Sequence, residues 1–287
     1  MKRFFILASA AIVALASCAK TQVVYKDAPQ EIAFKTVDMP MTKATYDADL
    51  GVVAFYMDGQ EYFGMSEFKL QNGVWTGSKY WPLSTPLKFL AYGPYGAAGT
   101  VTNTSAELKS VAVPDNVDFV YSYVDNDGNG FTKKGAQVTG VYMPMKHTKS
   151  KVVVTVQTGT NETVTKVELL ATPVKGDCTI AIPAGDISWA FTDADKADVD
   201  FTTDIRHLVI PSTPSILKIT YDSKNPDQDG LTVEIDLSAV AMKDSSNNVL
   251  TGNWLPGYSY TYNITISSTE ITVHGQTTDW IEVSNNA

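Results

Sequence analysis

Hydrophobic and polar side chains alternate with a period of two along several short stretches of this chain. From residue 258 to residue 266 every second residue is Tyr or Ile, and the residues between them are Ser, Thr or Asn. The same alternation recurs over residues 217–221 and 231–237. Because successive side chains of a strand point to opposite faces, this pattern predicts strands with one buried and one polar face.

Turn-forming residues separate these stretches. Gly, Pro, Asn, Asp and Ser cluster at residues 158–161, 183–186, 223–230 and 244–248, and no window carries a long helical period. Short, evenly spaced strands with such turns predict an all-β fold, an antiparallel sandwich or barrel. The first half follows the same pattern more loosely, with strands over 51–56 and 86–92 and longer loops over 93–105 and 125–135.

The length of 287 residues suits two domains of ordinary size. The loop-rich first half ends near residues 140–150, and dense strands begin at Lys149. We therefore expect an N-terminal β-sandwich domain over residues 31–145 and a C-terminal β-sandwich domain over residues 146–287.

Residues 1–17 have the features of an export signal. Lys2 and Arg3 form a short positive region, and residues 4–16 are apolar and uncharged. That run is shorter than the roughly 20 apolar residues that cross a bilayer. It matches instead the apolar core of a secretory signal peptide.

The apolar run ends in a pattern typical of bacterial lipoproteins. Leu15, Ala16 and Ser17 precede Cys18, as in a lipobox, where small residues fit the signal peptidase and the thiol takes the lipid. Acyl chains such as palmitate on Cys18 would anchor the protein, because each buried methylene contributes about 0.8 kcal/mol. We expect a lipoprotein of the outer membrane with residues 18–30 as a tether. The alternative is an ordinary signal peptide followed by a chance cysteine.

Charge and motifs argue against several classes of function. The chain has 22 Lys and Arg against 31 Asp and Glu, a net charge of −9 without a basic cluster, which argues against nucleic acid. His147, His207 and His274 lie far apart, and zinc, nucleophile-elbow and phosphate-loop motifs are missing. We expect no enzyme activity, no cofactor and no metal. A carboxylate pair for glycoside hydrolysis stays open, because distant strands can supply one.

One loop has half of the pattern of a calcium site. Asp125, Asp127 and Asn129 occupy positions 1, 3 and 5 of an EF-hand-like loop, with Gly130 at position 6. Position 12 is Ala136 instead of a bidentate Glu, and no helices are expected around it. We favour a surface turn without a metal and keep calcium as the alternative.

Several other side chains have an expected place. Cys178 lies among Thr, Ile and Ala and is expected to be a small core or strand residue. Trp75, Trp81 and Trp189 lie near turns, so they are the best candidates for an exposed sugar-stacking surface. The acidic run from Asp193 to Asp200 is expected to be a solvated loop.

Several short motifs, in this order, resemble those of the fimbrillin family, the subunits of type V pili. The segments that carry the resemblance are Ile32–Phe34, Thr42–Ala44, Tyr80–Pro82, Leu87–Pro94, Asp118–Tyr121, Met143–His147, Lys151–Val154, Trp254, Pro256–Tyr262 and Asp279–Trp280. They span nearly the whole chain after the expected signal peptide. Each is short, but their order and spacing together make the resemblance fairly specific.

The resemblance implies two transthyretin-like β-sandwich domains and assembly by strand exchange. A first strand containing Ile32 and Phe34 would be removed by proteolysis, and the groove would accept a strand of another subunit. We expect the donor near Glu270 to Val283, where Ile271 and Val273 alternate with polar residues. The partners would then be other pilin subunits or further copies of this chain.

Processing is the point at which the chain departs from the family. The family's protease often cuts after Arg, but Arg206 is the sole Arg after residue 17 and lies within the second domain. Processing would then use Lys43 or another Lys, or would not occur. The first hypothesis is therefore a structural pilus subunit, in the stalk or at the tip, that supports adhesion without catalysis. An unprocessed protein would be an anchor or not a pilin at all, and the second hypothesis is a non-polymerising outer-membrane lipoprotein that binds a glycan or host ligand. A surface hydrolase is the third hypothesis and the weakest.

Overall fold

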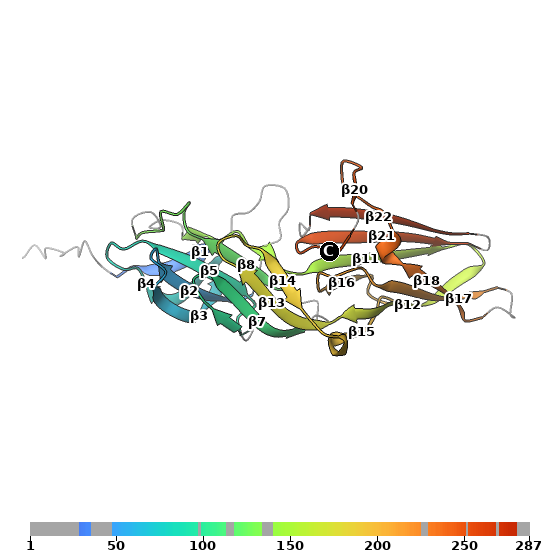
Figure 1. Cartoon of the computed structure of the whole chain (residues 1–287), viewed down its shortest axis with the longest axis horizontal. Helices are drawn as coiled ribbons and strands as arrows, with labels where there is room; N and C mark the ends of the chain where they lie inside the picture. The colour runs from blue at the N-terminus through green and yellow to red at the C-terminus, as the bar shows by residue number, and fades with distance from the viewer. Residues whose placement is uncertain are drawn as a thin grey trace, which may run out of the picture.

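The computed structural model describes residues 29–35, 48–96, 99–112, 118–133, 140–224, 229–250, 252–267 and 270–279. These residues form strands, turns and two short 3-10 helices. Figure 1 shows an elongated molecule with the first strands at one end and the last strands at the other. No helix among the described residues is long and apolar enough to span a bilayer.

An eight-stranded sheet forms the N-terminal end. Its strands, in spatial order, are β10 (Lys146–His147), β8 (Val120–Val124), β5 (Leu87–Gly93), β2 (Leu50–Tyr56), β3 (Glu61–Gln71), β4 (Val74–Tyr80), β1 (Glu31–Lys35) and β9 (Val141–Tyr142). The sheet folds over on itself, because the ring of Phe34 on β1 lies 5.0 Å from that of Phe89 on β5, with three strands between them in the sheet. Its core lies inside this fold.

A four-stranded sheet covers the other face of β5 and β8. Its order is β14 (Ile187–Ala190), β13 (Lys175–Ala181), β7 (Ser105–Ala112) and β6 (Gly99–Val101). Leu90 and Tyr121 of the first sheet pack with Leu108 and Ile180 of this one. The strands β13 and β14 follow residue 146 in the chain, but β13 pairs with β7 and β14 pairs with β13, so a cut at 145/146 would divide this sheet.

Two sheets form the C-terminal sandwich. One has the order β16 (Arg206–Val209), β11 (Ser150–Thr158), β21 (Tyr258–Ile266), β22 (Ile271–Asp279), β19 (Met242–Lys243) and β20 (Val249–Leu250). The other has the order β15 (Lys196–Asp200), β12 (Glu162–Pro173), β17 (Ile216–Ser223) and β18 (Leu231–Asp236). The 3-10 helices η1 (Asp193–Asp195) and η2 (Leu237–Ala239) precede β15 and follow β18.

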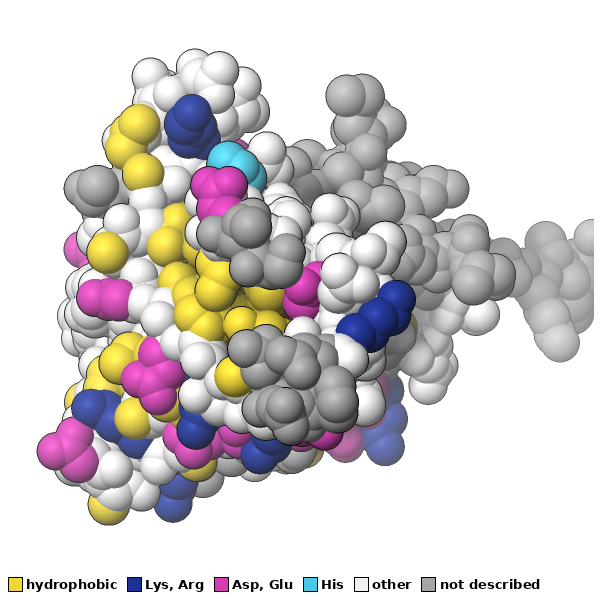
Figure 2. Space-filling model, turned by 90° about the vertical axis from the view of Figure 1, so that its right-hand side faces the viewer, with side chains coloured by type: hydrophobic (Ala, Val, Ile, Leu, Met, Phe, Trp, Pro, Cys, Tyr) yellow, Lys and Arg dark blue, Asp and Glu magenta, His cyan; other side chains and the backbone are white. Residues whose placement is uncertain are grey.

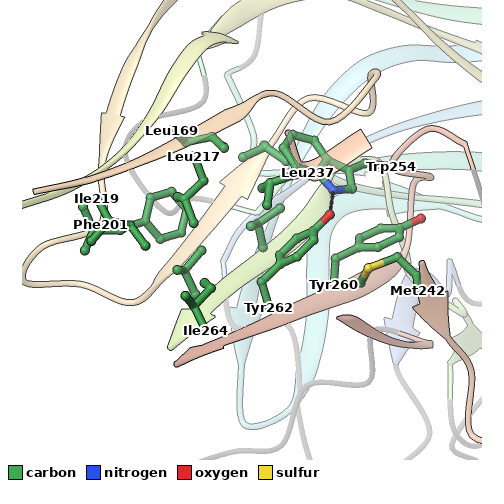
Figure 3. Close-up of a cluster of buried hydrophobic side chains, with 14 of the residues drawn as sticks. Leu169, Phe201, Leu217, Ile219, Leu237, Met242, Trp254, Tyr260, Tyr262 and Ile264 are labelled. Carbon is green, nitrogen blue, oxygen red and sulfur yellow. Dashed lines mark hydrogen bonds between the residues drawn. The ribbon is translucent and has the colours of Figure 1, made fainter. Parts of the chain in front are cut away.

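The core of this sandwich lies between its two sheets (Figure 3). Tyr262 projects inward from β21, and its hydroxyl accepts a hydrogen bond of 2.9 Å from the buried Trp254 Nε1. At the outer end of the sandwich, hydrophobic side chains gather in a central group among polar and charged ones (Figure 2). The apolar interior therefore reaches the surface where the two sheets end.

The predicted all-β sandwich fold is confirmed, and the strands agree closely with the alternation in the sequence. β21 covers residues 258–266, β17 covers residues 217–221, and β18 covers residues 231–236, after which Leu237 begins η2. The transthyretin-like topology stays a prediction.

Two predicted loops contain regular structure. β6 lies within the expected loop 93–105, and the acidic run forms η1 and β15 instead of a loop. The reason for β15 is that Val199 packs against the sandwich core while Asp198 and Asp200 lie exposed on the opposite face. The sequence of such a strand, with one half-buried Val among exposed acidic residues, looks like that of a solvated loop.

Candidate strand-exchange site

The strand β1 is inserted between two strands of the first sheet. It runs antiparallel to β4, with Phe34 opposite Trp75, and parallel to β9, with Phe34 opposite Val141. β9 is two residues long and forms the edge of the sheet. Removal of β1 would therefore leave unpaired backbone groups on both β4 and β9.

Alternate side chains of β1 fill an apolar groove. Ile32 and Phe34 are fully buried, while Glu31 is exposed and Ala33 and Lys35 are half-buried on the outer face. The Phe34 ring makes edge-to-face contacts with Phe68 and Phe89, each with ring centroids 5.0 Å apart. The buried residues that the structure adds to the predicted pair in this cluster include Phe68, Trp75, Trp81, Phe89, Val141 and Met143.

Hydrogen bonds hold both ends of β1. The Trp81 N–H donates to the Gln30 carbonyl (2.9 Å), and the Ser78 N–H donates to Glu31 Oε1 (2.8 Å). At the other end the Met143 N–H donates to the Lys35 carbonyl (2.9 Å).

A glycine lets the chain approach β1 closely before β9. Gly140 has φ +77°, and a Cβ placed on it would lie 2.9 Å from the Ala33 carbonyl oxygen. Any other residue would be strained there and would push β1 outward. The alternation in the sequence could not indicate this contact, because it is made by backbone.

The chain after the predicted cleavage site is held independently of β1. Lys43 lies outside the described residues, and the described chain resumes at Ala48. The Ala48 carbonyl accepts a hydrogen bond from Trp75 Nε1 (2.9 Å), and Asp49 Oδ1 accepts one from the Leu70 N–H (3.0 Å). Loss of the segment before residue 44 would thus leave these anchors in place.

The predicted donor segment forms β22 as far as residue 279. It pairs with β21 along its whole length, but with β19 only at Gly275 and Gln276. Ile271 is 37% exposed, whereas Val273 packs against the sandwich core. The two predicted donor side chains therefore differ, since only Val273 packs against the core of its own domain.

The predicted exposure of the tryptophans is wrong for two of the three. Trp75 and Trp81 are buried because they line the groove under β1. Trp189 is half-buried, and its Nε1 donates to the Thr148 carbonyl (2.9 Å). The exposed aromatic side chains of the described residues are instead Tyr80, Tyr95 and Tyr142.

The lipobox residues Leu15, Ala16, Ser17 and Cys18 lie outside the described residues. Cys178 is fully buried in β13, and burial raises the pKa of its thiol to about 12, against a smaller lowering by Lys149. That agrees with a packing role.

The candidate calcium loop is a tight turn. Asn126, Asp127, Gly128 and Gly130 have positive φ, and the Gly130 N–H donates to the Asp125 carbonyl (2.7 Å). The Asn126 amide donates back to the Gly130 carbonyl (2.9 Å), so the turn closes on itself. Within the described ranges, no group of three or more His, Cys, Asp or Glu side chains is placed to hold a metal ion. Ala136 lies outside those ranges, and a surface turn without a metal stays a prediction.

A family model for fimbrillin-like proteins matches residues 39–280 of the chain. Among solved structures, a candidate cell adhesion protein from Bacteroides uniformis has a TM-score of 0.62 at 18% identity, covering 88% of this chain and 99% of that one. A candidate cell adhesion protein from Bacteroides ovatus has a TM-score of 0.57 at 15% identity, with 88% and 99% covered. A fimbrial protein from Bacteroides vulgatus has a TM-score of 0.52 at 15% identity, with 87% and 99% covered. At these identities the similarity shows a shared fold. No curated protein matches the chain.

Proposed function

The chain belongs to the fimbrillin-like family, and from this membership we propose that it is a structural, non-enzymatic subunit of a bacterial surface pilus. In this proposal it is exported as a lipoprotein through Cys18 and reaches the outer membrane. Processing near Lys43 then removes β1, and subunits join by strand exchange. The subunit would form part of the stalk or the tip of the pilus and support adhesion.

The main observation in support of the proposal is the position of β1 between β4 and β9 in the sheet. It is a five-residue strand with two fully buried side chains, and the chain that follows residue 47 is anchored without it. Burial of Ile32 and Phe34 contributes about 1.5–3 kcal/mol each. Without β1, the apolar groove and the free edges of β4 and β9 would favour binding of another strand.

The donor must leave a sheet of its own to fill that groove. β22 would give up nine residue pairs with β21 and two with β19. Exchange is favourable only if the groove replaces those pairs and buries side chains that are exposed in the free subunit. Ile271 is such a side chain, because it is 37% exposed in β22.

A non-polymerising surface binder is the second candidate. Tyr80 and Tyr142 are exposed and lie opposite Glu31 and Lys35 in the strands on either side of β1. Exposed tyrosine rings at the surface can stack on a sugar or contact a protein ligand. This function needs β1 to stay in place.

The test is limited trypsin treatment of the purified protein beginning at residue 19, with the new N-terminus sequenced. We expect cleavage after Lys43 to give ladders of oligomers on size-exclusion chromatography, and Lys43→Ala to remain monomeric. A synthetic peptide of residues 29–43 in excess should refill the groove and suppress the ladders. The same peptide with Phe34→Asp should not.

The variant Ile271→Asp serves as the matched donor control. Its side chain is exposed in the free subunit, so the monomer should fold normally, but an aspartate could not fill an apolar groove. Trimmed wild-type protein that stays a stable monomer would contradict the pilus proposal and favour the surface binder. Ladders that persist with Ile271→Asp would contradict the assignment of the donor alone.

A further inference from the structure

A pocket opens into the C-terminal sandwich on the side where β21 begins. It has a volume of about 220 Å³. Figure 3 shows five of its lining residues, with Trp254 beside Leu237 and the ring of Tyr260 beside Met242. The full lining is Pro214, Leu237, Val240, Met242, Gly252, Asn253, Trp254, Leu255, Tyr258, Tyr260 and Tyr262. The proposed strand exchange does not use this pocket.

The chemistry of the walls suits a neutral ligand. None of the lining side chains is charged. The Tyr262 hydroxyl accepts its hydrogen bond from Trp254, and the Tyr260 hydroxyl accepts one from the Leu255 N–H (2.8 Å). Burial raises the pKa of both phenols, so they stay neutral. The interior therefore offers aromatic rings and methyl groups, and the polar atoms of Trp254, Tyr260 and Tyr262 already have hydrogen-bond partners.

Hydrogen bonds hold one side of the pocket in place. The Trp254 N–H donates to the Ser212 carbonyl (2.8 Å), and the Gly257 N–H donates to the Lys149 carbonyl (2.9 Å). Together with the bond between Leu255 and Tyr260, they fix the segment 254–257, in which Trp254 and Leu255 line the pocket. Voids larger than a water molecule are few in well-packed interiors, so a fixed opening of this volume among aromatic rings indicates a binding site.

The volume and the mouth define the class of ligand. A cavity of about 150 Å³ lined by aliphatic and aromatic side chains is enough to hold benzene, and drug-sized molecules occupy roughly 300 Å³ or more. At the mouth, Leu255 is 51% exposed, and a Cβ on Gly252 would meet no atom within 4 Å. The exposed Asn253, whose Oδ1 accepts from the Thr213 hydroxyl (3.0 Å), gives the rim a polar group.

We propose that this pocket binds a small neutral molecule with one aromatic ring, whose polar substituent faces the rim at Asn253. The ring would lie against Tyr260 and Trp254. An anionic aromatic molecule would be excluded, because the pocket has no cationic side chain to offset its desolvation.

The test is isothermal titration calorimetry of the purified protein with p-cresol, and with benzoate at pH 7 as the charged control. We expect saturable binding of p-cresol at one site and binding of benzoate at least tenfold weaker. Val240→Trp places a large side chain in the pocket and should weaken p-cresol binding at least tenfold. Val249→Trp makes the same change at an exposed position outside the lining and should leave it unchanged.

A second measurement locates the ligand without any substitution. In a methyl NMR spectrum, p-cresol should shift the Met242 methyl resonance through its ring current and leave that of Met65, in β3 of the eight-stranded N-terminal sheet, unmoved. Failure of p-cresol to bind would overturn the proposal. So would equal binding by Val240→Trp, or binding that leaves the Met242 methyl unshifted.

Discussion

His147 Nδ1 and Asp118 Oδ2 form a hydrogen bond between the end of β10 and the residues just before β8. Both side chains are mostly buried, and the Asp118 Oδ1 atom has no hydrogen-bond partner among the described residues. The pair extends the β8–β10 ladder, in which His147 stands opposite Val120. Because β11 begins three residues after His147, the pair fixes the point where the chain enters the C-terminal sandwich.

We expect His147→Ala to lower the free energy of unfolding by about 1.5–3 kcal/mol, the typical contribution of a hydrogen bond to a charged group. The substitution leaves a buried carboxylate without its partner. The double variant Asp118→Ala, His147→Ala should cost less than the sum of the two single variants. Urea unfolding of all four proteins measures this coupling, and strict additivity would show that the pair contributes nothing.

The aromatic contacts of Phe34 lead to a second prediction, which concerns the stability of the N-terminal half. Phe34→Ala removes a fully buried ring that contacts Phe68 and Phe89, so it should cost about 3–5 kcal/mol in unprocessed protein. Leu83→Ala is the control, because Leu83 is 79% exposed in the same half of the molecule, and it should change stability by less than about 0.5 kcal/mol. Denaturant unfolding measures both. Equal small losses would mean that β1 is not part of the core.

Gly77 in β4 lies against Phe68, which belongs to the same hydrophobic cluster as Phe34. A Cβ on Gly77 would lie 2.6 Å from the Glu67 carbonyl oxygen and 2.8 Å from the Phe68 ring. Gly77→Ala should therefore destabilise the protein by about 1–3 kcal/mol through overpacking. Gly64→Ala is the matched control in β3, because its Cβ would meet only the end of the flexible Glu61 side chain, at 3.0 Å. Thermal unfolding in which both variants behave alike would contradict this packing.

The positions of several strands could be predicted because those strands have one buried and one polar face. Residues 258–266 show this most clearly, since the alternation of Tyr and Ile coincides with β21. The choice of pairing partners could not be predicted. The alternation tells which face of a strand is buried but not which strand lies beside it. The sequence therefore could not predict that β13 pairs with β7 of the N-terminal half, with Cys178 opposite Leu108.

The strand-exchange site around β1 could also be predicted only in part. Ile32 and Phe34 alternate with polar or small residues, and the structure buries both. The predicted exposure of Trp75 and Trp81 is wrong, because both residues are near turns in the sequence but lie on the inner side of the folded sheet. A residue near a turn is exposed only if no other strand covers it, and β1 comes from a distant part of the chain.

Cys178 should be inert in the folded protein. Burial raises the pKa of its thiol from 9 to about 12, so almost no thiolate forms at pH 8. Iodoacetamide should label it only when the protein unfolds, as read by mass spectrometry with and without denaturant. Because the unfolded thiol ionises first, its ionisation should also lower stability as the pH rises from 9 towards 12. Rapid labelling of native protein at pH 8 would contradict the burial of this strand.

The lipid anchor is tested directly at its cysteine. Cys18→Ser removes the only cysteine of the lipobox, so a clickable palmitate analogue should label the wild-type protein in cells and not the variant. Because about two acyl chains are needed for stable anchoring, the variant should also be lost from the outer-membrane fraction. Cys178→Ser is the matched control and should be labelled and fractionated like the wild type, since Cys178 is buried in β13. Palmitate labelling that survives in Cys18→Ser would show that the membrane attachment lies elsewhere in the chain.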